Sequence, residues 1–175
     1  MVKKCMLSVL GMVLFCGTAL AEPTGWGLSF GGGEAFLDID VYRLGLKKDF
    51  PWQWLKSDFG YVSGYFELSF NHWEQGSDEI DGVAFSPVLA YYFCKKDNLI
   101  RPYIEGGIGV IYIDKHMMAD RNLSTDFQFE DRIGVGARIG FFDLNFLRYM
   151  HYSNASIKGP NYGIDMWMFT VSIQF

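Results

Sequence analysis

Cysteine and histidine are both scarce in this chain, which has three of each among its 175 residues. Cys5 and Cys16 lie in an apolar N-terminal run, and Cys94 is the only cysteine beyond that run. One cysteine cannot form an internal disulfide, and three scattered histidines without further cysteines do not make a zinc ligand set. The histidines are His72, His116 and His151. The sequence therefore predicts no disulfide framework and no structural metal site.

Positive charge is also scarce, with 15 lysines and arginines against 20 acidic residues and a formal net charge of -5. Lys3 and Lys4 lie at the extreme N-terminus, and without them the net charge falls from -5 to -7. Domains that bind nucleic acid present a basic face to the phosphate backbone. The sequence therefore predicts no nucleic-acid partner.

The N-terminus has the pattern of an export signal. Lys3 and Lys4 precede an apolar run from Cys5 to Leu20, and Ala19-Leu20-Ala21 gives the small-x-small pattern of a cleavage site. The alternative, a retained membrane anchor, is less favoured because a spanning helix needs roughly 20 apolar residues. We predict a signal peptide over residues 1–21 and a single exported domain over residues 22–175.

Long apolar runs are absent after residue 21, so the sequence predicts no transmembrane helix, although half of all residues are apolar and 18% are aromatic. Alternation explains this composition. In the last segment the residues of one face are apolar: Trp167, Phe169, Val171, Ile173 and Phe175. Thr170, Ser172 and Gln174 occupy the other face. A strand with one face for lipid and one for water, ending on an aromatic residue, is typical of outer-membrane barrels.

Eight such strand-like runs follow one another along the chain. They are Thr24–Phe36, Asp38–Lys47, Gly60–Trp73, Gly82–Cys94, Leu99–Lys115, Phe127–Gly140, Phe141–Asn154 and Ile164–Phe175. Lipid cannot pair an open strand edge, so a sheet in the membrane must close on itself. We therefore predict an all-β fold, an eight-stranded antiparallel transmembrane β-barrel, whose interior is filled by side chains. The charged residues expected to pair inside it are Glu67, Glu105, Arg132, Arg138 and Arg148.

The stretch "RYMHYSNASIKGPNYGIDMW", residues 148–167, brings three reactive side chains together. His151 and Ser153 are two apart on a strand, so they share a face with alpha carbons roughly 6.5 Å apart. A hairpin centred in "IKGPN" places Asp165 opposite them. Asp165 has the register of the lipid-facing residues, so the three groups are expected on the outer wall, where Leu147 and Tyr149 continue the face as apolar residues.

Depth in the membrane follows from strand length. A barrel strand crosses the apolar layer in roughly 9 to 11 residues, which places Asp165 near the outer surface if Phe175 is at the periplasmic end. Ser153 as nucleophile, His151 as base and Asp165 as the orienting acid would form a hydrolytic triad. Asn154 would donate a hydrogen bond to the developing oxyanion. The alternative is that these are ordinary polar residues at the ends of two strands.

At these residues the sequence resembles the PagL-type lipid A 3-O-deacylases of Gram-negative outer membranes. The specific part of the resemblance is "HYSNA" followed by a short loop and "NYGID". It implies that Ser153 is the nucleophile, His151 the base and Asn154 an oxyanion donor. It also implies an enzyme of the outer membrane that hydrolyses the ester-linked hydroxyacyl chain at the 3 position of lipid A, the lipid moiety of lipopolysaccharide, without a cofactor.

The sequence departs from the family pattern at two positions. The family acid is usually Glu, whereas Asp165 is one methylene shorter, and the residue two after Asn154 is often Gly but here is Ser156. The backbone amide of Ser156 can still serve as an oxyanion donor if its backbone angles permit. The sequence leaves two other functions open, a non-enzymatic structural or adhesion barrel and a calcium-dependent phospholipase, and it does not decide whether a homodimer forms.

Overall fold

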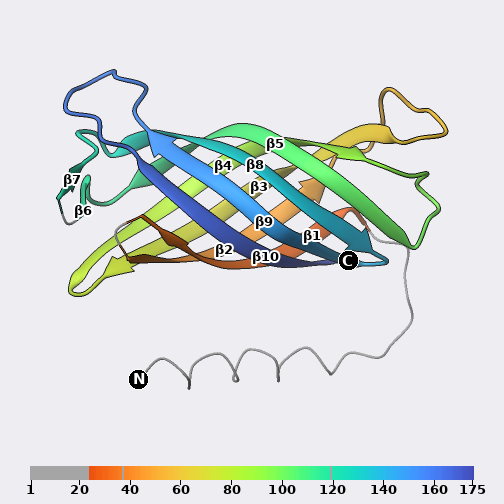
Figure 1. Cartoon of the computed structure of the whole chain (residues 1–175), viewed down its shortest axis with the longest axis horizontal. Coiled ribbons are helices and arrows are strands. Elements are labelled where there is room, and N and C mark those ends of the chain that lie inside the picture. The colour runs from red at the N-terminus through yellow and green to blue at the C-terminus, as the bar shows by residue number, and fades with distance from the viewer. Residues whose placement is uncertain (1–23, 37, 119) are drawn as a thin grey trace.

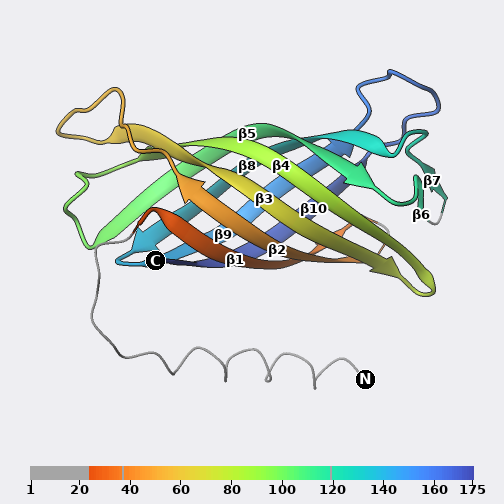
Figure 2. The same ribbon diagram turned by 180° about the vertical axis from the view of Figure 1, so that it is seen from behind.

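The computed structural model describes residues 24–36, 38–118 and 120–175 and shows a closed antiparallel barrel (Figures 1 and 2). Its strands are β1 (Trp26–Ala35), β2 (Ile39–Asp49), β3 (Tyr61–Gln75), β4 (Asp78–Tyr92), β5 (Ile100–Ile113), β8 (Phe127–Ile139), β9 (Phe142–Ser153) and β10 (Ile164–Gln174). Each strand pairs with its neighbour in the chain, and β10 closes the barrel on β1. The predicted eight-stranded barrel is confirmed.

The largest difference from the predicted boundaries is in β4. This strand begins at Asp78, four residues before the predicted start at Gly82, because the β3–β4 hairpin continues beyond the apolar part of the wall. Its charged residues interrupt the apolar alternation from which the boundary was predicted. The hairpin is the yellow-green projection at one end of the barrel in Figure 1.

The two ends of the barrel differ in their connections. The first described residue, Thr24, and the C-terminal Phe175 lie side by side at the end that also carries the β2–β3, β4–β5 and β8–β9 connections (Figures 1 and 2). At the opposite end the β5–β8 connection contains a small hairpin, β6 (Met117–Met118) and β7 (Arg121–Asn122), which lies beside the β9–β10 loop. Since Phe175 is expected from the sequence at the periplasmic side, we call the end that holds Thr24 and Phe175 the periplasmic end and the opposite end the extracellular end.

The predicted signal peptide, residues 1–21, lies outside the described residues. Within the described residues, no helix has both the length and the apolar character needed to cross a membrane.

The barrel wall follows the predicted alternation. In β10, Trp167 and Phe169 are exposed on the outside while Met168 and Thr170 are buried in the lumen. The same alternation along the other strands leaves an outer surface rich in large apolar side chains, among them Leu44, Leu46, Phe66, Leu68, Phe70, Phe85, Leu89, Ile104 and Ile108. Such a surface is suited to the hydrocarbon layer of a membrane.

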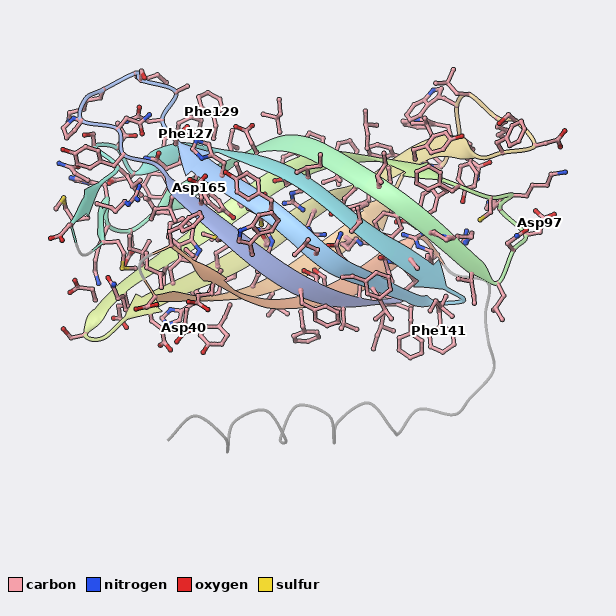
Figure 3. The ribbon with its side chains drawn as sticks, viewed as in Figure 1. Asp40, Asp97, Phe127, Phe129, Phe141 and Asp165 are labelled. Atoms are coloured by element: carbon pink, nitrogen blue, oxygen red, sulfur yellow. The ribbon has the colours of Figure 1, made fainter. Side chains whose placement is uncertain are left out.

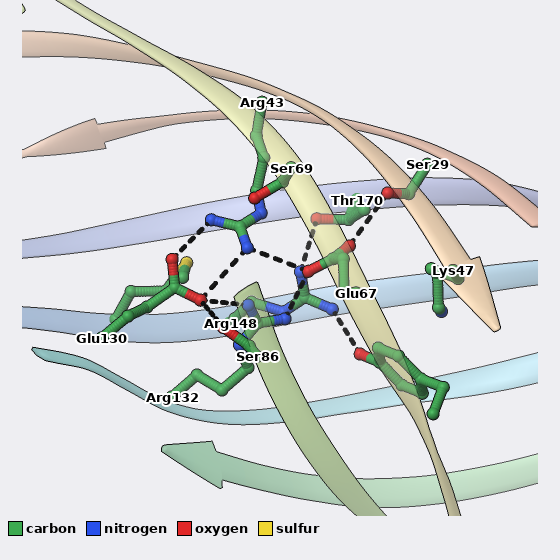
Figure 4. Close-up of polar contacts among 12 residues, drawn as sticks. Ser29, Arg43, Lys47, Glu67, Ser69, Ser86, Glu130, Arg132, Arg148 and Thr170 are labelled. Atoms are coloured by element: carbon green, nitrogen blue, oxygen red, sulfur yellow. Dashed lines mark hydrogen bonds and ion pairs between the residues drawn. The ribbon is translucent and has the colours of Figure 1, made fainter. Parts of the chain in front are cut away.

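The lumen is filled by a network of ion pairs at its centre. Arg43 lies between two carboxylates, with its guanidinium nitrogens 3.0 Å from Glu67 and 2.7 Å from Glu130 (Figure 4). Arg132 donates to the same two carboxylates. Arg148 lies 2.7 Å from Glu105. The predicted pairing inside the barrel is confirmed for Glu67 with Arg132 and for Glu105 with Arg148, whereas Arg138 pairs with Asp49 and Asp143. The filled lumen leaves no room for a wide pore.

Apolar side chains fill the lumen toward the extracellular end. Trp73 of β3 packs edge-on against Tyr152 of β9, with ring centroids 4.8 Å apart, and both are fully buried. The Tyr152 hydroxyl donates to Glu130 at 2.9 Å. Tyr152 lies between His151 and Ser153 in the sequence, so this contact fixes from within the part of β9 that presents those two residues on the outside.

Candidate functional site

The candidate site lies on the outer wall, where β8, β9 and β10 reach the extracellular end. Cross-strand pairing arranges its side chains in three rows. From the extracellular side these are Phe129 and Ser153; then Asp131, His151 and Asp165; then Ile133, Tyr149 and Trp167. Figure 3 shows Phe127, Phe129 and Asp165 together at this end of the barrel. The register pairs His151 with Asp165, as a hairpin centred near Lys158 predicts.

His151 and Asp165 form a close hydrogen-bonded pair. The imidazole Nδ1 lies 2.6 Å from Asp165 Oδ1, and the two side chains are 36% and 32% exposed. Because an ionised carboxylate only accepts hydrogen bonds, Nδ1 carries the proton in this contact. Nε2 is then the imidazole nitrogen that can accept a proton. Asp131 is the direct cross-strand partner of His151 on the other side, but the hydrogen bond is to Asp165.

Ser153 is the last residue of β9, and its side chain lies on the same face as that of His151, two residues away. It is half-buried, and among the described residues its hydroxyl has no hydrogen-bond partner. The structure therefore brings Ser153, His151 and Asp165 to one place on the outer wall.

Tyr149 was expected on this face only as an apolar residue. Its hydroxyl donates to Asp165 Oδ1 at 2.6 Å, the oxygen that also accepts from His151. Its ring packs against Trp167, with centroids 5.0 Å apart. Sequence reasoning missed this contact, although the spacing of two between Tyr149 and His151 was a usable clue.

Asn154 lies in the first turn after β9 and is fully buried. Its side-chain amide donates to the carbonyl oxygens of Leu123, at 2.8 Å, and Lys158, at 2.9 Å. Both amide hydrogens are thus bound to backbone carbonyls of the two extracellular loops. The next two residues, Ala155 and Ser156, have positive φ angles of 50° and 63°. Among the described residues, no acceptor binds their backbone N–H groups.

The β5–β8 connection holds the β9–β10 loop in place. Arg121 of β7 donates to the carbonyl oxygens of Tyr162, at 2.8 Å, and Gly163, at 3.1 Å. Ser124 donates to the carbonyl oxygen of Pro160. Gly163 lies directly against the imidazole, because a Cβ atom at this position would be 3.0 Å from His151 Cε1. The β9–β10 loop therefore lies against the imidazole of His151 at its Cε1 edge.

A shallow, open apolar groove of about 430 Å³ lies on the outer wall, on the periplasmic side of this site. It is lined by Ile133, Gly134, Val135, Leu147, Tyr149 and Trp167. A β-bulge shifts the β9 register on the periplasmic side of Leu147, so Leu147, Tyr149 and His151 keep the common face that the alternation predicted.

All three histidines of the chain bind an aspartate through Nδ1. His72 lies 2.7 Å from Asp81, and His116 lies 2.9 Å from Asp126. The residues two positions after these histidines are Glu74 and Met118, which have no hydroxyl. His151 differs from them because Ser153 follows at that spacing. In the part of the chain that the structure describes, no three acidic, histidine or cysteine side chains are grouped to hold a metal ion.

Fold and site together define a small membrane β-barrel that carries a serine and a His–Asp pair on its lipid-facing wall. The family model of the lipid A 3-O-deacylases, PagL, matches residues 40–174, and the chain belongs to this family.

Individual relatives agree with this assignment. Lipid A deacylase PagL of Pseudomonas aeruginosa is 39% identical over 130 residues, which are 73% of each chain. Lipid A deacylase PagL of Bordetella bronchiseptica is 30% identical over 181 aligned positions, covering 98% of this chain and 96% of that protein. The crystal structure of the outer membrane enzyme PagL superposes with a TM-score of 0.80 at 33% identity, covering 85% of this chain and 99% of that one. The predicted family and outer-membrane location are confirmed.

Proposed function

We propose that this chain is a lipid A 3-O-deacylase that cleaves its ester substrate with a triad of Ser153, His151 and Asp165. The observation that carries the proposal is the 2.6 Å contact between His151 Nδ1 and Asp165 Oδ1, on the face that Ser153 shares. Asp165 thus reaches the imidazole although it is one methylene shorter than the usual family acid. The activity itself agrees with the family to which the chain belongs.

The reaction runs in two halves. His151 Nε2 takes the proton of the Ser153 hydroxyl as Ser153 Oγ attacks the ester carbonyl carbon, and Asp165 stabilises the resulting imidazolium. The tetrahedral intermediate collapses when His151 returns the proton to the departing sugar oxygen. This leaves the acyl chain on Ser153. A water molecule, deprotonated by His151, then releases the fatty acid and restores the serine.

The negative oxygen of the tetrahedral intermediate needs hydrogen-bond donors. We assign this role to the backbone N–H groups of Ala155 and Ser156, which follow the nucleophile and have no acceptor among the described residues. Such a donor contributes about 3 kcal/mol to transition-state stabilisation. Asn154, which was expected from the sequence to be an oxyanion donor, holds the turn in this proposal, because its amide already donates to the carbonyl oxygens of Leu123 and Lys158.

The groove below the triad fits the acyl chain of the substrate. Its lining is apolar, it is open to the surrounding lipid, and it begins at Tyr149, one row below His151 and Asp165. A lipid whose ester lies at head-group level would place its carbonyl beside Ser153 and its chain along Ile133 and Leu147. The substrate would therefore react without leaving the membrane.

Mass spectrometry of lipid A tests this function. We expect the refolded barrel to remove one hydroxyacyl mass, and Ser153→Ala to remove none at matched protein and incubation time. Ser77→Ala, which changes an exposed serine at the tip of the β3–β4 hairpin, is the control and should keep full activity.

Three other outcomes have defined meanings. Equal deacylation by the wild type and by Ser153→Ala would show that Ser153 is not the nucleophile. Intact lipid A with a folded barrel would favour a structural or adhesion protein. Release of fatty acid from phospholipid, stopped by calcium chelation, would favour a phospholipase.

We also propose that residues 1–21 are removed on export. The intact mass of the protein extracted from outer membranes tests this, because cleavage after Ala21 predicts a chain that begins at Glu22. An intact mass that includes residues 1–21 would contradict it.

A further inference from the structure

We infer that Tyr149 is a positioning residue that holds the Asp165 carboxylate in the orientation His151 requires. This inference rests on the proposed function, since it concerns the acid of the proposed triad. Tyr149 lies outside the Ser–His–acid pattern, and its hydroxyl is directed at the acid instead of the ester.

The geometry allows one carboxylate oxygen to serve both donors. Tyr149 and His151 are two apart on β9, and each places its donor 2.6 Å from Asp165 Oδ1. The direct cross-strand partner of Tyr149 is Trp167, so its hydroxyl reaches diagonally along the face to Asp165. An sp² oxygen has two lone pairs, which is enough for both hydrogen bonds.

The ring of Tyr149 is itself held in place. It packs against Trp167 with centroids 5.0 Å apart and an interplanar angle of 55°. The hydroxyl therefore approaches Asp165 from a fixed direction. By contrast, Asp165 is about one-third exposed on the outer wall, and among the described residues its side chain is bound only by Tyr149 and His151. Without the tyrosine hydroxyl, only the catalytic base would orient this short acid.

Tyr149 also lines the apolar groove, so it has two separable contributions. In the proposed complex the ring would contact the acyl chain and affect substrate binding. The hydroxyl contacts Asp165 and would affect the chemical step. Tyr149→Phe removes the hydroxyl and keeps the ring, so it tests the positioning role alone. Hydrogen bonds to charged groups are worth enough that we expect kcat to fall roughly tenfold with KM unchanged.

A double-mutant cycle distinguishes action through Asp165 from any other effect. We would measure kcat and KM on lipid A for the wild type, Tyr149→Phe, Asp165→Ala and the double variant, each checked for folding by heat-modifiable mobility on gels. If Tyr149 acts through Asp165, Tyr149→Phe has no further effect in the Asp165→Ala background. The control is Tyr112→Phe, because Tyr112 is exposed on the outer wall of β5 and its hydroxyl has no partner among the described residues.

A second measurement does not depend on lipid A. A fluorophosphonate reacts with an activated serine by forming the Oγ–P bond and releasing fluoride, while the serine proton passes to the base. We expect Tyr149→Phe to slow this labelling of Ser153 roughly tenfold, as it slows kcat. If the wild type is labelled normally but does not deacylate lipid A, the proposed substrate is rejected. The comparison of labelling rates between the wild type and Tyr149→Phe then still tests the role of Tyr149.

Three results would overturn the inference. The first is a Tyr149→Phe variant with the kcat and the labelling rate of the wild type. The second is a Tyr149→Phe variant that changes KM alone. The third is a fall in kcat on adding Tyr149→Phe to Asp165→Ala that equals its effect in the wild type.

Discussion

Gly163 contributes no side chain to the site. Because it lies against His151, however, the addition of a single methyl group at this position would disturb the imidazole. Its φ is +60°, and a Cβ atom would lie 3.0 Å from the imidazole Cε1. We expect Gly163→Ala to displace His151 and lower kcat about tenfold or more, in addition to about 1 kcal/mol of backbone strain. Gly76 is a matched control, because it has a φ of +63° but open space around it.

Kinetics on lipid A and urea unfolding of both alanine variants separate the two effects. Gly163→Ala should lose somewhat more stability than Gly76→Ala, because its Cβ would also lie 3.1 Å from the Tyr152 carbonyl oxygen, and only Gly163→Ala should lose activity. Full activity in folded Gly163→Ala would show that the glycine does not set the position of the imidazole.

At the level of single residues, the sequence predicts the position of a side chain where that position depends only on strand parity. His151 and Asp165 meet because cross-strand partners share a face, and this could be worked out from the hairpin centre alone. The contacts of Asn154 with Leu123 and of Tyr149 with Asp165 could not be predicted in this way. The first joins two loops distant in sequence, and the second depends on a side-chain direction that alternation does not specify.

At the level of elements, β6 and β7 form a hairpin too short to give an alternating pattern, and it was not predicted. It matters because Arg121 of β7 holds the carbonyl groups of Tyr162 and Gly163. We expect Arg121→Met to loosen the β9–β10 loop and reduce kcat about fivefold, with little change in barrel stability.

Lys115 provides the comparison for Arg121. It lies in the same connection but donates to the carbonyl oxygen of Glu79 in the β3–β4 hairpin, away from the site. Lys115→Met should therefore keep wild-type kinetics on lipid A. If both variants have the same activity, the loop does not depend on Arg121 for its position.

At the level of the whole molecule, alternation and the need to close the sheet were enough to predict strand number and pairing. The ion pairs between charged side chains in the lumen were predicted less completely. Glu67 does bind Arg132 and Glu105 does bind Arg148, but Arg138 binds Asp49 and Asp143 instead. Partners across the lumen depend on strand stagger and tilt, which single-strand patterns do not contain.

The central ion-pair network gives a prediction about stability. Arg43→Met would leave Glu67 and Glu130 with Arg132 as their remaining guanidinium, in a buried environment. Removing one partner of a buried pair costs about 3–5 kcal/mol, so the free energy of unfolding should fall by that amount. Urea unfolding in lipid vesicles measures it. Lys48→Met changes an outward-facing cation five residues further along β2, whose hydrogen bond to the Thr24 carbonyl is exposed, so this variant should unfold nearly like the wild type. Equal stability of the two variants would refute the prediction.

The outward direction of Ser153, His151 and Asp165 changes the meaning of substrate concentration for this protein. A site on the wall meets its substrate by lateral diffusion in two dimensions, so its rate depends on the mole fraction of substrate in the surrounding leaflet. Adding an inert amphiphile at constant bulk substrate should slow turnover by surface dilution. The apparent affinity of this barrel for its substrate therefore depends on the composition of the surrounding leaflet as well as on the protein.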